Sequence, residues 1–147
     1  MYRRILVPVD GSAAAARGLR QAIRLARESG ARLRVLHVVD EAVTAMPFQV
    51  PLYGDRLHAP LREAGRRLLA RAEAQAARAG VKAQPRLVEN LVGHVGDAIA
   101  REANGWKADL LVLGAHGRRG MAKLVMGSDA ELAARAAKMP VLLVRAA

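Results

Sequence analysis

The sequence contains no cysteine and no long apolar run. Without cysteine, the protein has no disulfide bonds, no thiolate zinc site and no thiol catalysis. No run of about 18 apolar residues occurs that could span a membrane. The apolar stretch near the N-terminus ends at Asp10, which makes it too short for the hydrophobic region of a secretory signal. We therefore expect a soluble, cytoplasmic protein.

Aromatic residues are also scarce, at 3% of the chain, although 52% of the residues are hydrophobic. Alanine, valine and leucine must therefore build the core. Such small and branched side chains suit the close packing of helices on a sheet. The 147 residues fit a single domain, residues 1–147, which can bury roughly two thirds of its unfolded surface.

Acidic residues are few compared with basic ones: 13 Asp and Glu stand against 24 Lys and Arg, for a formal charge of +11. A charge of this size is typical of proteins that bind polyanions. The arginines are scattered along the chain, however, with no basic tail and no alternation of basic and aromatic residues. A compositional bias of the source genome explains this charge better than a nucleic-acid partner. An arginine-rich surface that binds polyanions stays open as an alternative.

Short apolar runs alternate with amphipathic segments along the chain. The apolar runs predict strands at residues 3–9, 32–39, 83–89, 108–114 and 141–145. The amphipathic segments predict helices at residues 13–29, 60–79, 97–104 and 128–138. The remaining long segments, residues 40–59 and 116–126, are expected to be loops, with a helical turn as an alternative for the second. This alternation predicts an α/β fold in which a single doubly wound parallel sheet carries helices on both faces.

Particular residues predict where these elements begin and end. Pro8 cannot donate to a sheet ladder, so it should stand at the end of its strand. Ser12 is expected to cap the first helix at its N-terminus, and Gly30 should follow its last turn. Pro60 is expected to begin the second helix. His37 should be a core histidine inside a strand, whereas His58 is expected in a solvated loop.

Ligands of doubly wound sheets bind at the carboxyl ends of the strands. Three segments leave strand ends here, beginning at Pro8, Val38 and Gly114. The third is the most informative, because Gly114, Gly117 and the pair Gly127-Ser128 form the pattern G-x2-G-x9-G-S between a strand and a helix.

This glycine pattern is suited to holding phosphate. We expect Gly114 and Gly117 to adopt positive φ angles and let the backbone approach a ligand closely. Their N–H groups, together with the N-terminus of the helix at Ser128, favour an anion, and Arg118 or Arg119 adds charge. The alternative is that the glycines only shape a turn and cap a helix. The pattern is not a Walker A loop, because the Gly-Lys-Ser/Thr ending is missing.

Three stretches, PVDGS, LHVVD and DLLVLGAHGRRG…MGSDAELAARAAKMPVLLV, together resemble the universal stress protein family. The resemblance covers essentially the whole chain, and the glycine spacing is similar to that of the ATP-binding branch. It implies a fold of the adenine nucleotide alpha hydrolase-like type, with five parallel strands in the order 3-2-1-4-5. It also implies a homodimer in which the strand from Val141 to Arg145 pairs across the two-fold axis, which suits an apolar edge strand.

The resemblance further implies which residues hold the nucleotide. Asp10 is expected to meet the ribose or the phosphates, and Val38 the adenine. The other implied cleft residues are Pro8, Val9, Gly114, His116, Gly117, Arg118, Gly127, Ser128 and Asp129. The sequence departs from the family pattern at Ala115, where Ser or Thr is common, and at Asp129, where an apolar residue is common. A carboxylate at Asp129 would repel a nearby phosphate.

These observations favour a protein that binds ATP, accompanied by magnesium, through the segment from Gly114 to Ser128 and uses it as a regulatory ligand in a stress response. No general base or catalytic triad can be argued from the spacing, so any hydrolysis should be slow. A nucleotide-independent dimeric scaffold is the main alternative, beside the polyanion binder. An enzyme of the wider hydrolase-like group is a further one, although no pyrophosphatase-type glycine loop follows the first strand.

Overall fold

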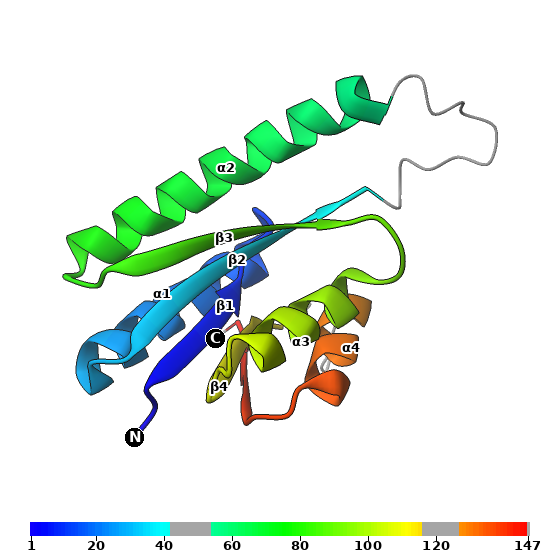
Figure 1. Ribbon diagram of the computed structural model, residues 1–147. Coiled ribbons are helices and arrows are strands. Elements are labelled where there is room, and N and C mark those ends of the chain that lie inside the picture. The colour runs from blue at the N-terminus through cyan, green and yellow to red at the C-terminus, as the bar shows by residue number, and fades with distance from the viewer. Residues whose placement is uncertain (42–53, 116–126, 147) are drawn as a thin grey trace.

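The computed structural model describes residues 1–41, 54–115 and 127–146. Strands and helices alternate along the chain, as Figure 1 shows. The elements are β1 (Arg4–Pro8), α1 (Ala13–Ser29), β2 (Arg32–Asp40), α2 (Gly54–Arg78), β3 (Ala83–Asn90), α3 (Val95–Gly105), β4 (Leu110–Gly114), α4 (Ser128–Ala136) and β5 (Val141–Val144). Each predicted strand and helix is therefore present, with bounds that differ by a few residues, except at the start of α2.

The strands form one sheet in the order β3-β2-β1-β4-β5, and each neighbouring pair is parallel. This is the predicted order. In the centre of the sheet, Ile5 of β1 lies opposite Leu33 of β2 and Leu110 of β4. Because all strands run in one direction, their carboxyl ends share one edge of the sheet. The strand order reverses between β1 and β4, which is the switch point of the sheet.

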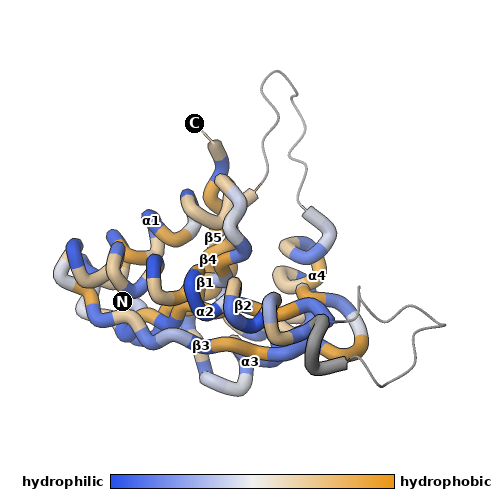
Figure 2. The backbone as a smooth tube through the Cα atoms, turned by 90° about the horizontal axis from the view of Figure 1, so that it is seen from above, coloured by the Kyte–Doolittle hydropathy of each residue, from blue (hydrophilic) through white to orange (hydrophobic). Residues whose placement is uncertain are grey.

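Two helices cover each face of the sheet. On one face, α1 and α2 pack through residues such as Ile23 and Leu69 against Val7 and Val35. On the other face, α3 and α4 pack through Ile99 and Ala133, among others, against the even-numbered residues of β1 and β2. Viewed from above in Figure 2, β4 and β5 are largely hydrophobic, while α1 alternates between hydrophobic and hydrophilic residues, as an amphipathic surface helix should.

The limits of α1 agree with the prediction. The Ser12 side chain accepts a hydrogen bond from the Ala15 N–H at 3.1 Å, and Gly30 follows the helix in the left-handed conformation. Pro8 is the last residue of β1, as expected, and a second strand proline, Pro85, lies in the edge strand β3. Both positions tolerate the missing N–H donor.

The start of α2 was predicted wrongly. The helix begins at Gly54, and Pro60 lies inside it rather than at its first position. Because proline has no N–H, it cannot donate the hydrogen bond to the carbonyl four residues earlier in the helix. Near the beginning of a helix this removes only one bond, and the helix can continue on both sides of the proline. Residues 54–59 therefore belong to α2 and not to the preceding loop, and His58 is a helical residue.

Candidate functional site

A cleft of about 200 Å³ lies at the carboxyl ends of β1, β2 and β4. Eight of the residues predicted from the sequence line it: Pro8, Val9, Asp10, Val38, Gly114, Gly127, Ser128 and Asp129. The structure thus brings together three segments that are far apart in the chain. The other three predicted residues, His116, Gly117 and Arg118, lie outside the described residues.

The turn between β1 and α1 forms one wall of the cleft and is held by its own hydrogen bonds. The Asp10 carboxylate accepts a bond from the Ser12 N–H at 2.9 Å. Gly11 between them has a φ of 84°, which a residue with a side chain rarely adopts. Behind the turn, the His37 ring nitrogen Nδ1 lies 2.7 Å from the Val9 carbonyl oxygen. His37 is therefore hydrogen-bonded within its strand, as predicted, but it is half-buried rather than part of the core. Asp10 remains exposed at the cleft.

Gly114 lies in the floor of the cleft, but not for the predicted reason. It does not have a positive φ, unlike four other described glycines of the chain. A Cβ at Gly114 would overlap the Ala14 carbonyl group of α1 and come within 2.9 Å of the Ala15 N. On the helix side, a Cβ at Gly18 would come within 3.1 Å of the Gly114 N. Glycine is needed here because the backbones of α1 and β4 touch.

The first turn of α4 closes the opposite wall. Gly127 caps the helix with φ −56° and ψ 148°, and its carbonyl accepts the Glu131 N–H at 3.0 Å. The N–H groups of the next three residues, Ser128, Asp129 and Ala130, have no carbonyl partner within the helix, as at every helix N-terminus. Since all three residues line the cleft, the positive end of the α4 dipole is located at its edge.

The Asp129 carboxylate is engaged by the neighbouring helix. Its Oδ1 accepts a hydrogen bond from the Gly96 N–H in the first turn of α3, at 3.3 Å. The two helices are in close contact at this point, since a Cβ on Gly96 would overlap the Asp129 carbonyl and come within 2.7 Å of the Leu132 Cβ. The negative charge of Asp129 is thus partly balanced by the N-terminal end of α3.

Several apolar residues that the motifs did not indicate also line the cleft. Val95 and Ile99 come from α3, Leu113 from β4, and Ala14 and Ala15 from α1. The sequence could assign these residues only to the core faces of their elements. An apolar residue on such a face can also border a cleft, and the sequence pattern does not distinguish the two positions. Together with Val38, they make the inner part of the cleft apolar.

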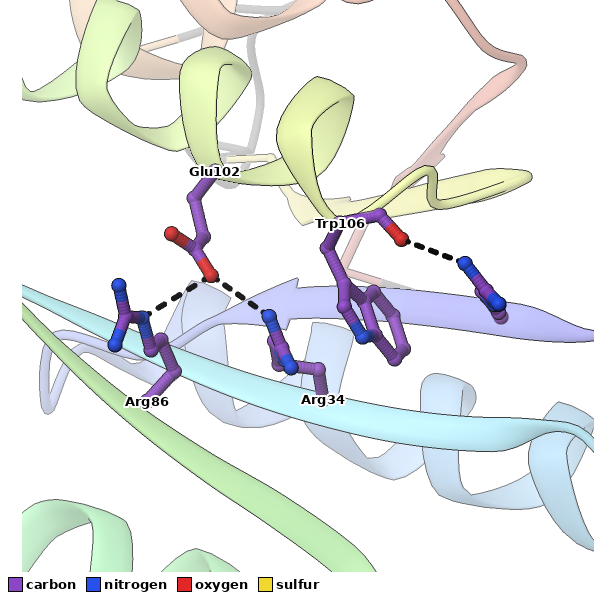
Figure 3. A network of polar contacts seen from close by, with 5 residues as sticks. Arg34, Arg86, Glu102 and Trp106 are labelled. Carbon is purple, nitrogen blue, oxygen red and sulfur yellow. Dashed lines mark hydrogen bonds and ion pairs between the residues drawn. The ribbon is translucent and has the colours of Figure 1, made fainter.

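A network of polar contacts holds α3 on the sheet, as Figure 3 shows. Oε1 of Glu102 accepts bonds from Arg34 of β2 at 2.8 Å and from Arg86 of β3 at 3.2 Å. The Arg34 guanidinium also lies over the Trp106 ring, 4.4 Å from its centroid. Arg4 of β1 donates to the Trp106 carbonyl oxygen at 3.0 Å. These contacts orient the helix whose other end supplies Val95 and Ile99 to the cleft.

A second polar cluster lies where β2 and β3 end. The carboxylate of Glu41 is buried, and its Oε1 lies 3.9 Å from Nδ1 of His58 and 3.8 Å from the Arg62 guanidinium. Arg62 also contacts Glu89 at 3.4 Å. His58 is therefore not a solvated loop residue, because it packs against a buried carboxylate. The charge pattern could not show this, since Glu41 and His58 are 17 positions apart.

Arg17 joins α1 to the segment that follows β4. Its guanidinium donates to the Ala115 carbonyl oxygen at 3.2 Å, and the Ala115 N–H bonds to Val144 of β5 at 2.8 Å. The amphipathic pattern of α1 indicated only a solvated arginine on its outer side. Ala115 is thus fixed from both sides immediately before the predicted glycine loop.

The donor groups suit an organic ligand better than a protein-held metal ion. Within the described ranges, no three His, Asp or Glu side chains are placed to hold a metal ion. The described lining contains two carboxylates, Asp10 and Asp129, and each accepts a backbone N–H. A divalent ion there would need further oxygen ligands, such as those of a bound molecule. In the same part of the chain, no helix is long and apolar enough to cross a membrane.

The sheet is doubly wound in the order 3-2-1-4-5, it carries four helices, and the cleft lies at its switch point. These features are those of an α/β protein with the adenine nucleotide alpha hydrolase-like fold. Comparison with known proteins specifies the class further. The model of the universal stress protein family matches residues 1–145. The chain therefore belongs to this family.

Individual relatives agree over the whole length. A universal stress protein of Thermus aquaticus, known from the 3′ region of a QAH/OAS sulfhydrylase, is 37% identical over 150 residues, which cover 99% of this chain and 100% of the relative. A crystal structure of a family member from Burkholderia pseudomallei is 38% identical, with a TM-score of 0.78, and covers 99% of this chain and 97% of its own. A universal stress protein solved in complex with cAMP is 26% identical, with a TM-score of 0.68 and coverage of 99% and 98%.

Proposed function

We propose that this universal stress protein binds ATP in the cleft at the switch point and uses it as a regulatory ligand. One observation carries the proposal. Eight residues that are expected to contact a nucleotide come from three separate segments of the chain, and all of them line a single cleft next to the N-terminus of α4. The crystallised relative that holds cAMP, an adenine nucleotide, supports the same class of ligand.

The chemistry of the walls suggests how ATP would lie. The apolar inner part, with Val38 and Ile99, suits the adenine ring, which gains from being removed from water. Asp10, exposed at the β1–α1 turn, is placed to accept hydrogen bonds from ribose hydroxyls. The N–H groups of Ser128 and Asp129, which have no carbonyl partner within α4, are suited to phosphate oxygens. We assign His116, Gly117 and Arg118 to the same phosphate region by their place in the glycine pattern.

Magnesium fits this arrangement as a companion of ATP. The cleft offers the Asp10 carboxylate and the Ser128 hydroxyl as protein oxygens. This is too few for a complete protein-built site, but it is typical of Mg²⁺ that binds mainly to phosphates and water. When bound, the ion would neutralise phosphate charge. None of the described cleft residues stands out as a strong general base, so we expect at most slow hydrolysis of ATP.

We further propose a cytoplasmic homodimer that pairs through its C-terminal strand. In the described sheet β5 is an edge strand whose one neighbour is β4. The carbonyls of Pro140 and Val144 bond to β4 through Leu111 and Ala115. Backbone groups alternate along a strand, so those of Val141 and Leu143 point to the open side and can pair with a second copy.

The small molecule retained by the purified protein tests the nucleotide assignment. Protein purified without added nucleotide is denatured, and the released compounds are identified by mass spectrometry. We expect an adenine nucleotide in a substantial fraction of the molecules. If no nucleotide is released, and none is retained after incubation with millimolar ATP and Mg²⁺, the protein is instead a scaffold that works without nucleotide.

A further inference from the structure

A groove lined by basic residues separates α1 from α2 on the face of the sheet that these helices cover. Three adjoining hollows form it: one beside the β1–α1 turn, one in the middle and one at the opposite end. Neighbouring hollows share lining residues, Gln75 between the first two and Arg27 between the last two. The cations along the groove are Arg20, Arg24, Arg27, Arg32, Arg71 and Lys82.

Among the described residues, these six cations have no acidic partner. No Asp or Glu is found among the described residues that line the three hollows. None of the six takes part in an ion pair within residues 1–41, 54–115 and 127–146. Some arginines elsewhere differ, because Arg34, Arg86 and Arg135 each pair with a glutamate. The fold thus brings six described cations that have no ion pair together along this one groove.

The spacing of the arginines on α1 suits a chain of phosphates. Arg20, Arg24 and Arg27 follow one another at intervals of four and three residues, so they form one row along the helix. The row is roughly 10 Å long, since an α-helix rises about 1.5 Å per residue. Consecutive phosphates of one duplex strand lie about 3.4 Å apart along the duplex axis. They are farther apart in space because the strand winds around that axis, so the row is long enough to contact at least two of them.

We propose that this groove binds the sugar–phosphate backbone of double-helical nucleic acid, independently of the nucleotide cleft. Guanidinium groups bind phosphate oxygens in pairs, which suits an arginine-rich surface. The described residues that line the groove include no aromatic side chain on which unpaired bases could stack. The described large hydrophobic residues that are exposed, such as Leu61 and Leu91, do not line it, which argues against insertion into a membrane. Contact with the backbone alone predicts binding without sequence preference.

A binding assay with matched variants tests this proposal. Fluorescence anisotropy is measured with labelled DNA and RNA duplexes of the same sequence, about two helical turns long, between roughly 50 and 200 mM salt. The variant carries R20Q, R24Q and R27Q together. The matched control carries R66Q, R67Q and R135Q, which remove the same charge from exposed arginines that are paired with glutamates. Glutamine is a good helix former, and circular dichroism of both proteins verifies that they fold.

The native protein should bind both duplexes, with an affinity that falls steeply as salt rises. The groove variant should lose at least about tenfold in affinity, and the slope of log K against log salt should become shallower by about 2 to 3 units, because each lost phosphate contact contributes about 0.9. The control should change far less. Equal losses in both variants would overturn the proposal, because net charge alone would then explain binding. Competition by polyglutamate as strong as that by unlabelled duplex would overturn the assignment to phosphate.

Discussion

The α-carbon of Gly114, at the end of β4, lies directly against the Ala14 carbonyl group in the first turn of α1. No side chain separates the two backbones. This contact brings the N-terminus of α1 to the floor of the cleft, where Ala14, Ala15 and Gly114 meet. The glycine at this position of the motif therefore has a structural cause that is independent of any ligand.

Replacing Gly114 with alanine should destabilise the protein. The new methyl group would overlap the Ala14 carbonyl, and moving α1 away should cost about 1–3 kcal/mol, as is usual for overpacking. Urea denaturation measures the free energy of unfolding. Gly105→Ala is the matched control, since a Cβ there meets nothing within 4 Å, and it should be neutral or stabilise by up to about 1 kcal/mol. Similar stabilities of the two variants would contradict the packing account.

Asp129→Asn should change affinity and stability in opposite directions. The amide oxygen can still accept the Gly96 N–H, while the negative charge beside the phosphate region is removed. ATP binding, measured by calorimetry, should tighten about fivefold, which corresponds to about 1 kcal/mol. Stability should fall by about 0.3–1 kcal/mol, because a favourable charge at the α4 N-terminus is lost. Glu131→Gln, in the same turn but outside the cleft lining, should lower stability without raising affinity.

Glu102→Gln should loosen α3 from the sheet. The substitution removes the charge that binds both Arg34 and Arg86, at a site that is only 15% exposed. We expect a loss of about 1–3 kcal/mol, the usual range for hydrogen bonds to charged groups. Trp106, the single tryptophan of the chain, lies beside Arg34 and reports the change by its fluorescence. The exposed pair of Glu131 and Arg135 supplies the control, and its loss should cost only about 0.3–0.5 kcal/mol.

Leu143→Pro should prevent the proposed dimer. Proline removes the N–H of a residue whose backbone faces the open side of β5, and leaves the bonds that Pro140 and Val144 make to β4. Light scattering should therefore find a monomer. Leu143→Ala shortens the same side chain but retains the N–H, so it should remain dimeric. Two dimeric variants would show that the protein does not pair through this strand.

Much of the fold could be predicted from the sequence because the signals are local. Apolar runs mark the strands, and Ser12 marks the start of α1 through a hydrogen bond that spans three residues. The start of α2 could not be predicted, because the helix tolerates Pro60 within it.

The motif residues indicated which segments border the cleft, but the sequence did not show the contacts between distant elements that shape it. Asp10 and the Gly127-Ser128 pair follow strand ends or begin a helix, which the sequence shows. The contact of Gly114 with Ala14 and the bond from Gly96 to Asp129 join residues 100 and 33 positions apart. Such contacts arise only from the three-dimensional arrangement of α1, α3 and α4.

The central claim is tested most directly by calorimetry. ATP with Mg²⁺ is titrated into nucleotide-free protein, and the native protein is compared with the Gly127→Val variant. Gly127 has an ordinary φ of −56°, so valine strains no backbone angle there but adds a side chain at the cleft. The account predicts one ATP per chain with micromolar affinity for the native protein and binding at least about tenfold weaker, or about 1.4 kcal/mol, for the variant. No binding to the native protein, or equal binding to both, would contradict it.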